Sequence, residues 1–130
     1  MPTIGGQPIH VLIVDDDAGS RLLMRRALER TGFVISEAAD GMAAVAAVEA
    51  GECNAVLMDV EMPAMNGYDA CRAIRAQPGG KDAIVVAITG WGQEQDRRRS
   101  EEAGFDAHLV KPVGERALRE VIARGQTRRA

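Results

Sequence analysis

The chain has 130 residues, enough for one domain with a buried core but too few for a catalytic domain with a second folded partner. Its formal net charge of -3 supplies no positive field for nucleic acid phosphates, so direct nucleic acid binding is not expected. No apolar run approaches the length that spans a bilayer, and the first eight residues lack the features of a signal peptide; we therefore expect a cytoplasmic protein without membrane contact.

Short apolar runs alternate with segments of helical periodicity along the chain. The composition, 46% hydrophobic and only 3% aromatic, favours aliphatic strands buried under helices. Five strands are predicted, at residues 9–14, 33–37, 55–58, 83–88 and 107–110, with a helix after each. This alternation predicts an α/β fold in which an open, doubly wound parallel sheet has helices on both faces.

Four of the predicted helices place apolar residues on one face, which suits them to cover a sheet. These faces consist of Leu23, Met24, Ala27 and Leu28; Ala44, Val45 and Val48; Ala70, Cys71 and Ile74; and Leu118, Val121 and Ile122. Gly32, Gly51 and Gly104 follow three of the helices and are predicted to terminate them. The predicted domain covers residues 9–125, with an N-terminal extension at 1–8 and a flexible tail at 126–130.

Four apolar runs end at a polar side chain, namely Asp15, Asp59, Thr89 and Lys111. The carboxyl ends of parallel strands meet at one edge of an open sheet, where such folds bind ligands. Carboxylates favour a hard divalent cation such as magnesium, and an ammonium together with that cation can offset the charge of a phosphoryl group. The sequence therefore predicts a site for phosphate chemistry.

The individual residues leave alternatives open. The adjacent carboxylates of Asp15, Asp16 and Asp17 repel one another unless a cation compensates, although Asp17 is equally well explained as a helix cap. Asp59 can be a metal ligand only, or a nucleophile that forms an acyl phosphate, and its spacing does not separate the two. A threonine such as Thr89 is by itself ordinary in a strand.

Four segments in this order resemble the receiver domain of bacterial two-component response regulators, the CheY-like family: VLIVDDD at 11–17, VLMDVEMPAMNG at 56–67, VVAITG at 85–90 and HLVKPV at 108–113. The resemblance covers essentially the whole chain. It implies a flavodoxin-like (βα)5 fold with the strand order 2-1-3-4-5. The segment at residues 92–113 resembles in particular the receivers of hybrid histidine kinases.

The same resemblance implies the role of each acidic residue. Asp59 would be the phosphoacceptor. Asp16, Asp59 and the backbone carbonyl of Glu61 would hold one Mg²⁺ ion, and Asp15 would assist through a water bound to that metal. The chain would be a signalling phosphoacceptor that assists its own phosphorylation and dephosphorylation, and not an enzyme with a separate substrate.

Switching is also implied by the resemblance. Lys111 would contact a phosphoryl oxygen, and Thr89 would swing its hydroxyl toward the phosphoryl group. His108 occupies the rotating switch position, and Glu61 and Trp91 occupy positions that tune hydrolysis. The phosphoryl donor would be a histidine kinase or a histidine phosphotransfer protein. A downstream partner or a second copy of the chain would use the face formed by the fourth helix, fifth strand and fifth helix.

Two other classes of protein compete with this interpretation. A phosphatase of the haloacid dehalogenase type needs a threonine or valine where this chain has Gly19, and it needs a cap insertion that the length does not allow. A pseudo-receiver, which keeps the fold as an interaction module without taking phosphate, is expected to lack an acidic residue or the lysine. Asp59 and Lys111 are both present, which argues against it.

Overall fold

The computed structural model describes residues 3–4, 6–62, 66–90 and 94–129. The elements in chain order are β1 (Thr3–Ile4), β2 (Gln7–Pro8), β3 (His10–Val14), α1 (Ala18–Leu28), β4 (Val34–Ala38), α2 (Gly41–Glu49), β5 (Ala55–Asp59), α3 (Gly67–Ala76), β6 (Ile84–Thr89), α4 (Glu94–Ala103), β7 (Ala107–Val110) and α5 (Glu115–Arg129). The five predicted strands correspond to β3 through β7, with ends that differ by at most one residue.

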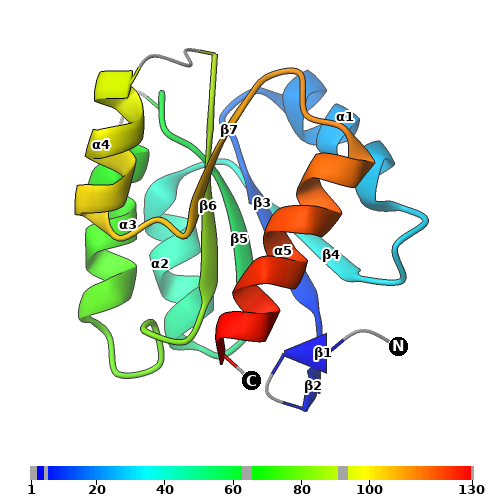
Figure 1. Cartoon of the computed structure of the whole chain (residues 1–130), viewed down its shortest axis with the longest axis horizontal. Helices are drawn as coiled ribbons and strands as arrows, with labels where there is room; N and C mark the ends of the chain where they lie inside the picture. Colours follow the sequence, from blue (N-terminus) through cyan, green and yellow to red (C-terminus); the bar gives the residue numbers. More distant parts are fainter. Residues whose placement is uncertain (1–2, 5, 63–65, 91–93, 130) are drawn as a thin grey trace.

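The main sheet has five parallel strands in the order β4-β3-β5-β6-β7. Numbered over these five strands, the order is 2-1-3-4-5, so the predicted doubly wound topology is confirmed. Helices α2, α3 and α4 cover one face of the sheet, and α1 and α5 cover the other (Figure 1). The connections thereby bring the carboxyl ends of all five strands to one edge.

Alternate residues of the central strands feed two separate hydrophobic cores, because successive side chains of a strand point to opposite faces. In β5, Val56 and Met58 pack beneath α2 and α3, whereas Leu57 packs beneath α1 and α5. Strands β5 and β6 are buried along their whole length. Their unbroken apolar sequence is the consequence of having helices on both sides.

One predicted helix face was too wide. In α1, Met24 and Leu28 are buried, but the Leu23 side chain is 69% exposed. Adjacent helical residues are separated by about 100° around the axis, and α1 packs against β3, β4 and α5, so its buried stripe excludes Leu23. The other predicted faces contain the buried residues Ala44, Val48, Ala70, Cys71, Ile74, Leu118, Val121 and Ile122.

The N-terminal segment forms an element that the sequence analysis did not predict. Strands β1 and β2 pair antiparallel as a short hairpin. The Asn54 side chain connects this segment to the sheet, since its amide donates to the Pro8 carbonyl and its oxygen accepts from the His10 N–H. At the other end of the chain, α5 continues to Arg129, beyond residue 126 where the tail was predicted to begin. The predicted domain limits themselves stay a prediction.

The ends of helix α3 are fixed by two different devices. Gly67 begins the helix against the backbone at the end of β5, and a Cβ there would lie 2.6 Å from Val60 Cα and 2.8 Å from the Asp59 carbonyl oxygen. Only glycine allows this approach. Near the other end, the Arg75 guanidinium donates to the carbonyls of Gly80, Ala83 and Gly104 and pairs with Asp106 at 2.8 Å.

The three glycines predicted to end helices, Gly32, Gly51 and Gly104, all have positive φ, which confirms their predicted role.

Within the described residues, no helix combines the length and the apolar character needed to cross a membrane.

Candidate functional site

The predicted polar residues come together at the carboxyl edge of the sheet. Asp59 and Thr89 are the last residues of β5 and β6, Asp15 follows β3, and Lys111 follows β7. One oxygen from each of the carboxylates of Asp15, Asp16 and Asp59 lies within 4.8 Å of the others. The strand ends therefore build one acidic cluster beside a lysine.

Asp15 is held rigidly in this cluster. It is fully buried, and its Oδ1 accepts a hydrogen bond of 2.9 Å from the Asp17 N–H. Its own N–H donates to the Ala38 carbonyl, and the Arg21 guanidinium donates to its carbonyl at 2.8 Å. Asp17 itself caps α1 by accepting from the Ser20 N–H, so the capping alternative is correct for this residue. The exposed Asp16 is the third carboxylate of the cluster.

Asp59 is 5% exposed and has a defined set of partners. Its Oδ1 accepts from the Glu61 N–H at 2.9 Å, and its Oδ2 lies 3.6 Å from Lys111 Nζ. The following Val60 N–H donates to the Ile88 carbonyl, which continues the pairing of β5 with β6 beyond the strand. The loop after β5 is therefore anchored on its backbone, and the Asp59 carboxylate belongs to the acidic cluster.

Lys111 is directed by the strand that precedes it. Its N–H donates to the Thr89 carbonyl at 2.8 Å, and the peptide bond to Pro112 is cis. Its Nζ lies 3.1 Å from Asp15 Oδ2 and 3.6 Å from Asp59 Oδ2. The ammonium thus bridges two carboxylates, in a side chain that is partly exposed.

The two buried carboxyl groups have pKa values shifted in opposite directions. Burial and the charge of Asp15 raise the pKa of Asp59, and the Glu61 N–H and Lys111 offset this only in part. Burial also favours a higher pKa for Asp15, but hydrogen bonds from Ser20, Asp17 and Lys111 outweigh it and lower that pKa. Two neighbouring carboxyl groups whose pKa values are shifted in opposite directions are characteristic of sites that handle cations or protons.

The pKa of Lys111 also depends on this pair. Desolvation alone would lower it, but the hydrogen bond to Asp15 and the charges of Asp15 and Asp59 raise the pKa above its usual value. The ammonium is accordingly charged at neutral pH.

Thr89 and Glu61 form a contact that the sequence analysis missed. The Thr89 hydroxyl, in a side chain 2% exposed, donates to Glu61 Oε1 at 3.0 Å. Glu61 was predicted in the site through its carbonyl and through the family position two residues after Asp59. That position was the available signal, but it does not indicate where the carboxylate points. The metal contact of the Glu61 carbonyl stays a prediction.

His108 lies on β7, next to β6. Its Nδ1 is 2.8 Å from the hydroxyl of Ser100, a residue of α4 that is almost fully buried. This link from the predicted switch position to α4 was not predicted. Trp91, the other residue predicted to tune hydrolysis, and residues 63–65 of the second motif lie outside the described residues.

The donor set of the acidic cluster fits magnesium. Its ligands are carboxylate oxygens on a rigid backbone, which a hard divalent cation prefers. Asp16 and Asp59 are placed to hold such an ion, and Asp15 lies on the side of the cluster that is next to Lys111. Sulfur ligands do not compete, because Cys53 and Cys71 are buried in the core, where burial raises both thiol pKa values to about 11.

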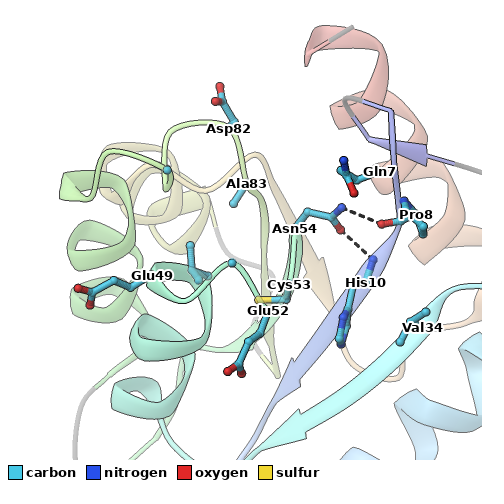
Figure 2. Close-up of a pocket in the computed structure, with 13 residues that line it drawn as sticks. Gln7, Pro8, His10, Val34, Glu49, Glu52, Cys53, Asn54, Asp82 and Ala83 are labelled. Carbon is cyan, nitrogen blue, oxygen red and sulfur yellow. Dashed lines mark hydrogen bonds between the residues drawn. The ribbon is translucent and has the colours of Figure 1, made fainter.

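A cavity of about 790 Å³ lies at the opposite edge of the sheet, next to His10, Asn54 and Ala83. Figure 2 shows that its three carboxylates, from Glu49, Glu52 and Asp82, point away from one another. They do not converge on a common position, so this cavity does not offer the chemistry that the carboxyl edge does.

Comparison with known proteins agrees with the geometry. The family model of the response regulator receiver domain matches residues 11–123. The chain is 36% identical over 124 residues to the sensor protein GacS of Pseudomonas syringae pv. syringae, a match that covers 93% of the chain. The chain spans only 14% of the length of that relative.

Two solved structures have the same fold. The receiver domain of sensor histidine kinase PA1611 from Pseudomonas aeruginosa PAO1 is 30% identical, with a TM-score of 0.83 over 92% of this chain and 98% of that one, and it has a magnesium ion coordinated in its active site cleft. A chain in the complex of the Saccharomyces cerevisiae histidine phosphotransfer protein Ypd1 with the receiver domain of its downstream response regulator Ssk1 is 26% identical. Its TM-score is 0.81, over 92% of this chain and 90% of that one.

Proposed function

The chain belongs to the response regulator receiver domain family of two-component and phosphorelay systems, and we propose that it accepts a phosphoryl group on Asp59. One observation carries this proposal: the buried Asp59 carboxylate shares Lys111 with Asp15 at the edge of the sheet. A carboxylate that served only to bind metal would not need an ammonium beside it. A carboxylate that receives a phosphoryl group does, because the incoming oxygens bring negative charge.

The donor in this proposal is the phosphohistidine of a histidine kinase or of a histidine phosphotransfer protein. A carboxylate oxygen of Asp59 attacks phosphorus, the P–N bond breaks, and its electron pair stays on the donor imidazole. Hydrolysis of the acyl phosphate by water then restores the carboxylate and releases inorganic phosphate. The proteins named in the comparisons, a sensor protein, a sensor histidine kinase and a phosphotransfer complex, support this choice of donor.

The residues of the site have different roles in this transfer. Lys111 neutralises phosphoryl oxygens, and the Glu61 N–H, which now donates to Asp59, keeps the acceptor oriented. A bound Mg²⁺ supplies charge neutralisation and alignment of the phosphoryl oxygens. Asp16, Asp59 and the Glu61 carbonyl would hold it, with Asp15 contributing through a water. In this proposal the chain is a phosphoacceptor that assists its own reactions, with no separate substrate.

The output in this proposal is a change on the face formed by α4, β7 and α5. Thr89 connects the acceptor to this face through the Lys111 N–H, and His108 connects β7 to α4 through Ser100. A downstream protein or a second copy of the chain would bind there. Similarity to receivers of both sensor kinases and a downstream regulator leaves the hybrid kinase assignment a prediction.

The test is intact-mass analysis after incubation with acetyl phosphate and Mg²⁺, in the native chain and in Asp59→Asn. We expect the native chain to gain one phosphoryl group only when Mg²⁺ is present, and Asp59→Asn to gain none. Asp69→Asn, which changes an exposed aspartate of α3, is the matched control and should behave as the native chain.

A phosphohistidine donor completes the test. If the native chain gains no phosphoryl group from acetyl phosphate or from a phosphorylated phosphotransfer protein, the phosphoacceptor proposal is wrong. The chain is then a pseudo-receiver that acts as an interaction module.

A further inference from the structure

We infer that Glu61 holds the Thr89 hydroxyl in the unphosphorylated chain and thereby opposes switching. This inference rests on the proposed function, since it concerns what must change when Asp59 is phosphorylated. It assigns to the Glu61 side chain a positioning role that is separate from any contact of its carbonyl with metal.

The geometry of the contact is defined by the backbone on both sides. The Glu61 N–H donates to Asp59 Oδ1 at 2.9 Å, which folds the residue back over the acceptor. Thr89 ends β6, and its carbonyl accepts from the Lys111 N–H at 2.8 Å. Two anchored backbones thus face each other, and the Thr89 hydroxyl spans the gap by donating to Glu61 Oε1 at 3.0 Å.

The Thr89 hydroxyl has one proton to donate. While Glu61 accepts that proton, it is not available to a phosphoryl oxygen on Asp59. A carboxylate is a strong acceptor, and hydrogen bonds to charged groups are stronger than those between neutral groups. For Thr89 to follow the phosphoryl group, this bond must first break, so Glu61 adds to the free energy that switching requires.

The charge of Glu61 also disfavours a phosphoryl group on Asp59. Glu61 adds a fourth carboxylate to the edge that already holds Asp15, Asp16 and Asp59, and its side chain is exposed. A phosphoryl group on Asp59 would bring further negative oxygens close to it. Repulsion then drives the Glu61 carboxylate outward and frees Thr89, which makes the contact specific to the unphosphorylated state.

The hydrogen bond and the charge can be separated by two substitutions. Glu61→Gln removes the charge but keeps an oxygen that can accept from Thr89, whereas Glu61→Ala removes both. Glu52→Ala, an exposed glutamate at the opposite edge of the sheet, is the matched control. None of these changes removes a buried side chain.

The first measurement is NMR of threonine methyl groups in the unphosphorylated chain. The Thr89 signal should shift in Glu61→Ala but remain near its native position in Glu61→Gln and Glu52→Ala. The second is a titration with beryllofluoride and Mg²⁺, in which beryllofluoride replaces the phosphoryl group and the fluorescence of the single tryptophan, Trp91, reports binding. Half-saturation should occur at a concentration about fivefold lower in Glu61→Ala, corresponding to one hydrogen bond, with a smaller change in Glu61→Gln.

The two hypotheses fail in different ways. If the native chain binds beryllofluoride and gains a phosphoryl group, but Glu61→Ala changes neither the Thr89 signal nor the half-saturation point, the role of Glu61 is wrong and the proposed function stands. If the native chain responds to neither reagent, the proposed function is wrong, and the role of Glu61 in switching is wrong with it.

Discussion

Lys111 and Asp15 are 96 residues apart in the chain, yet the Lys111 ammonium donates to Asp15 Oδ2 at 3.1 Å. Asp15 is fully buried, and the pair closes the acidic cluster on the side of β7. The Lys111 ammonium is therefore already paired with carboxylates before the proposed phosphoryl transfer. The Lys111 ammonium lies closer to Asp15 than to Asp59, from which it is 3.6 Å away.

Removal of this ammonium should separate metal binding from phosphoryl transfer. In Lys111→Gln we expect phosphoryl uptake from acetyl phosphate to fall about 100-fold, because a preorganised positive group beside the phosphoryl oxygens is lost. Mg²⁺ affinity should not fall, since the lysine repels the metal. The rate of mass gain and a Mg²⁺ titration measure the two effects. Lys81→Gln changes the chain's other lysine, which is exposed, and equal losses in both variants would contradict the assignment.

Magnesium should stabilise the chain in a pH-dependent manner. At ten times the dissociation constant we expect about 1.4 kcal/mol of added stability. The pKa of Asp59 is raised above 3.8, so protons compete with the metal at pH values where an ordinary aspartate is already ionised. Affinity should rise with pH through the raised pKa of Asp59 and then level off. Asp15, with its lowered pKa, stays charged over this range.

The measurement is a Mg²⁺ titration from about pH 4 to about pH 8, followed by thermal unfolding with and without metal. Asp59→Asn should bind Mg²⁺ more weakly and lose the rise in affinity that follows the Asp59 pKa. An unchanged pH profile in this variant would show that another group controls the site.

Arg75 should contribute far more to stability than its neighbour Arg72. Arg75 donates to four backbone carbonyls and pairs with Asp106, which is 7% exposed, so Arg75→Ala leaves a nearly buried carboxylate without this cation. We expect a loss of about 3 kcal/mol. Arg72 pairs with Asp69 on the exposed face of the same helix, and Arg72→Ala should cost about 0.5 kcal/mol or less. Urea unfolding compares the two variants, and similar losses would argue against the network.

Gly80 should tolerate no side chain, in contrast to the adjacent Gly79. A Cβ at Gly80 would lie 1.6 Å from the Ile74 carbonyl oxygen, whereas a Cβ at Gly79 would have no heavy atom within 4 Å. We expect Gly80→Ala to lower the free energy of unfolding by about 3 kcal/mol or more, and Gly79→Ala to change it by about 0.5 kcal/mol or less. Chemical denaturation of both variants tests the difference, and a stable Gly80→Ala protein would show that the loop moves freely.

The sheet and the members of the site could be predicted because one physical pattern specifies both. Strands covered on both faces must be apolar throughout, so the sequence marks each strand end by its first polar residue. Asp15 and Lys111 directly follow their strands, and Asp59 and Thr89 close theirs. Parallel connections then bring those ends to one edge.

The contacts between side chains could not be predicted, because they depend on rotamers and on loop geometry. Nothing in the spacing of Glu61 and Thr89 indicates that the carboxylate folds back onto the hydroxyl. The link from Ser100 to His108 likewise depends on how α4 is set against β7.

The hairpin of β1 and β2 does have a signal in the sequence. Two adjacent glycines lie between short segments of extended chain, and one of them, Gly6, has a φ of +82°.

The prediction for Leu23 was wrong because the sequence does not distinguish an apolar residue beside the buried face of a helix from one within that face.

Helix α3 has a mechanical consequence that follows from its two fixed ends. Its first residue, Gly67, lies against the backbone of Asp59, the proposed acceptor, and Arg75 in its last turn binds the loop that leads into β7. The helix joins the carboxyl edge of the sheet to the opposite edge. A helix fixed at both ends holds the backbone around Asp59 in place. In the proposed function, we therefore expect changes that begin at Asp59 to pass sideways, through Thr89 and His108, and not along α3.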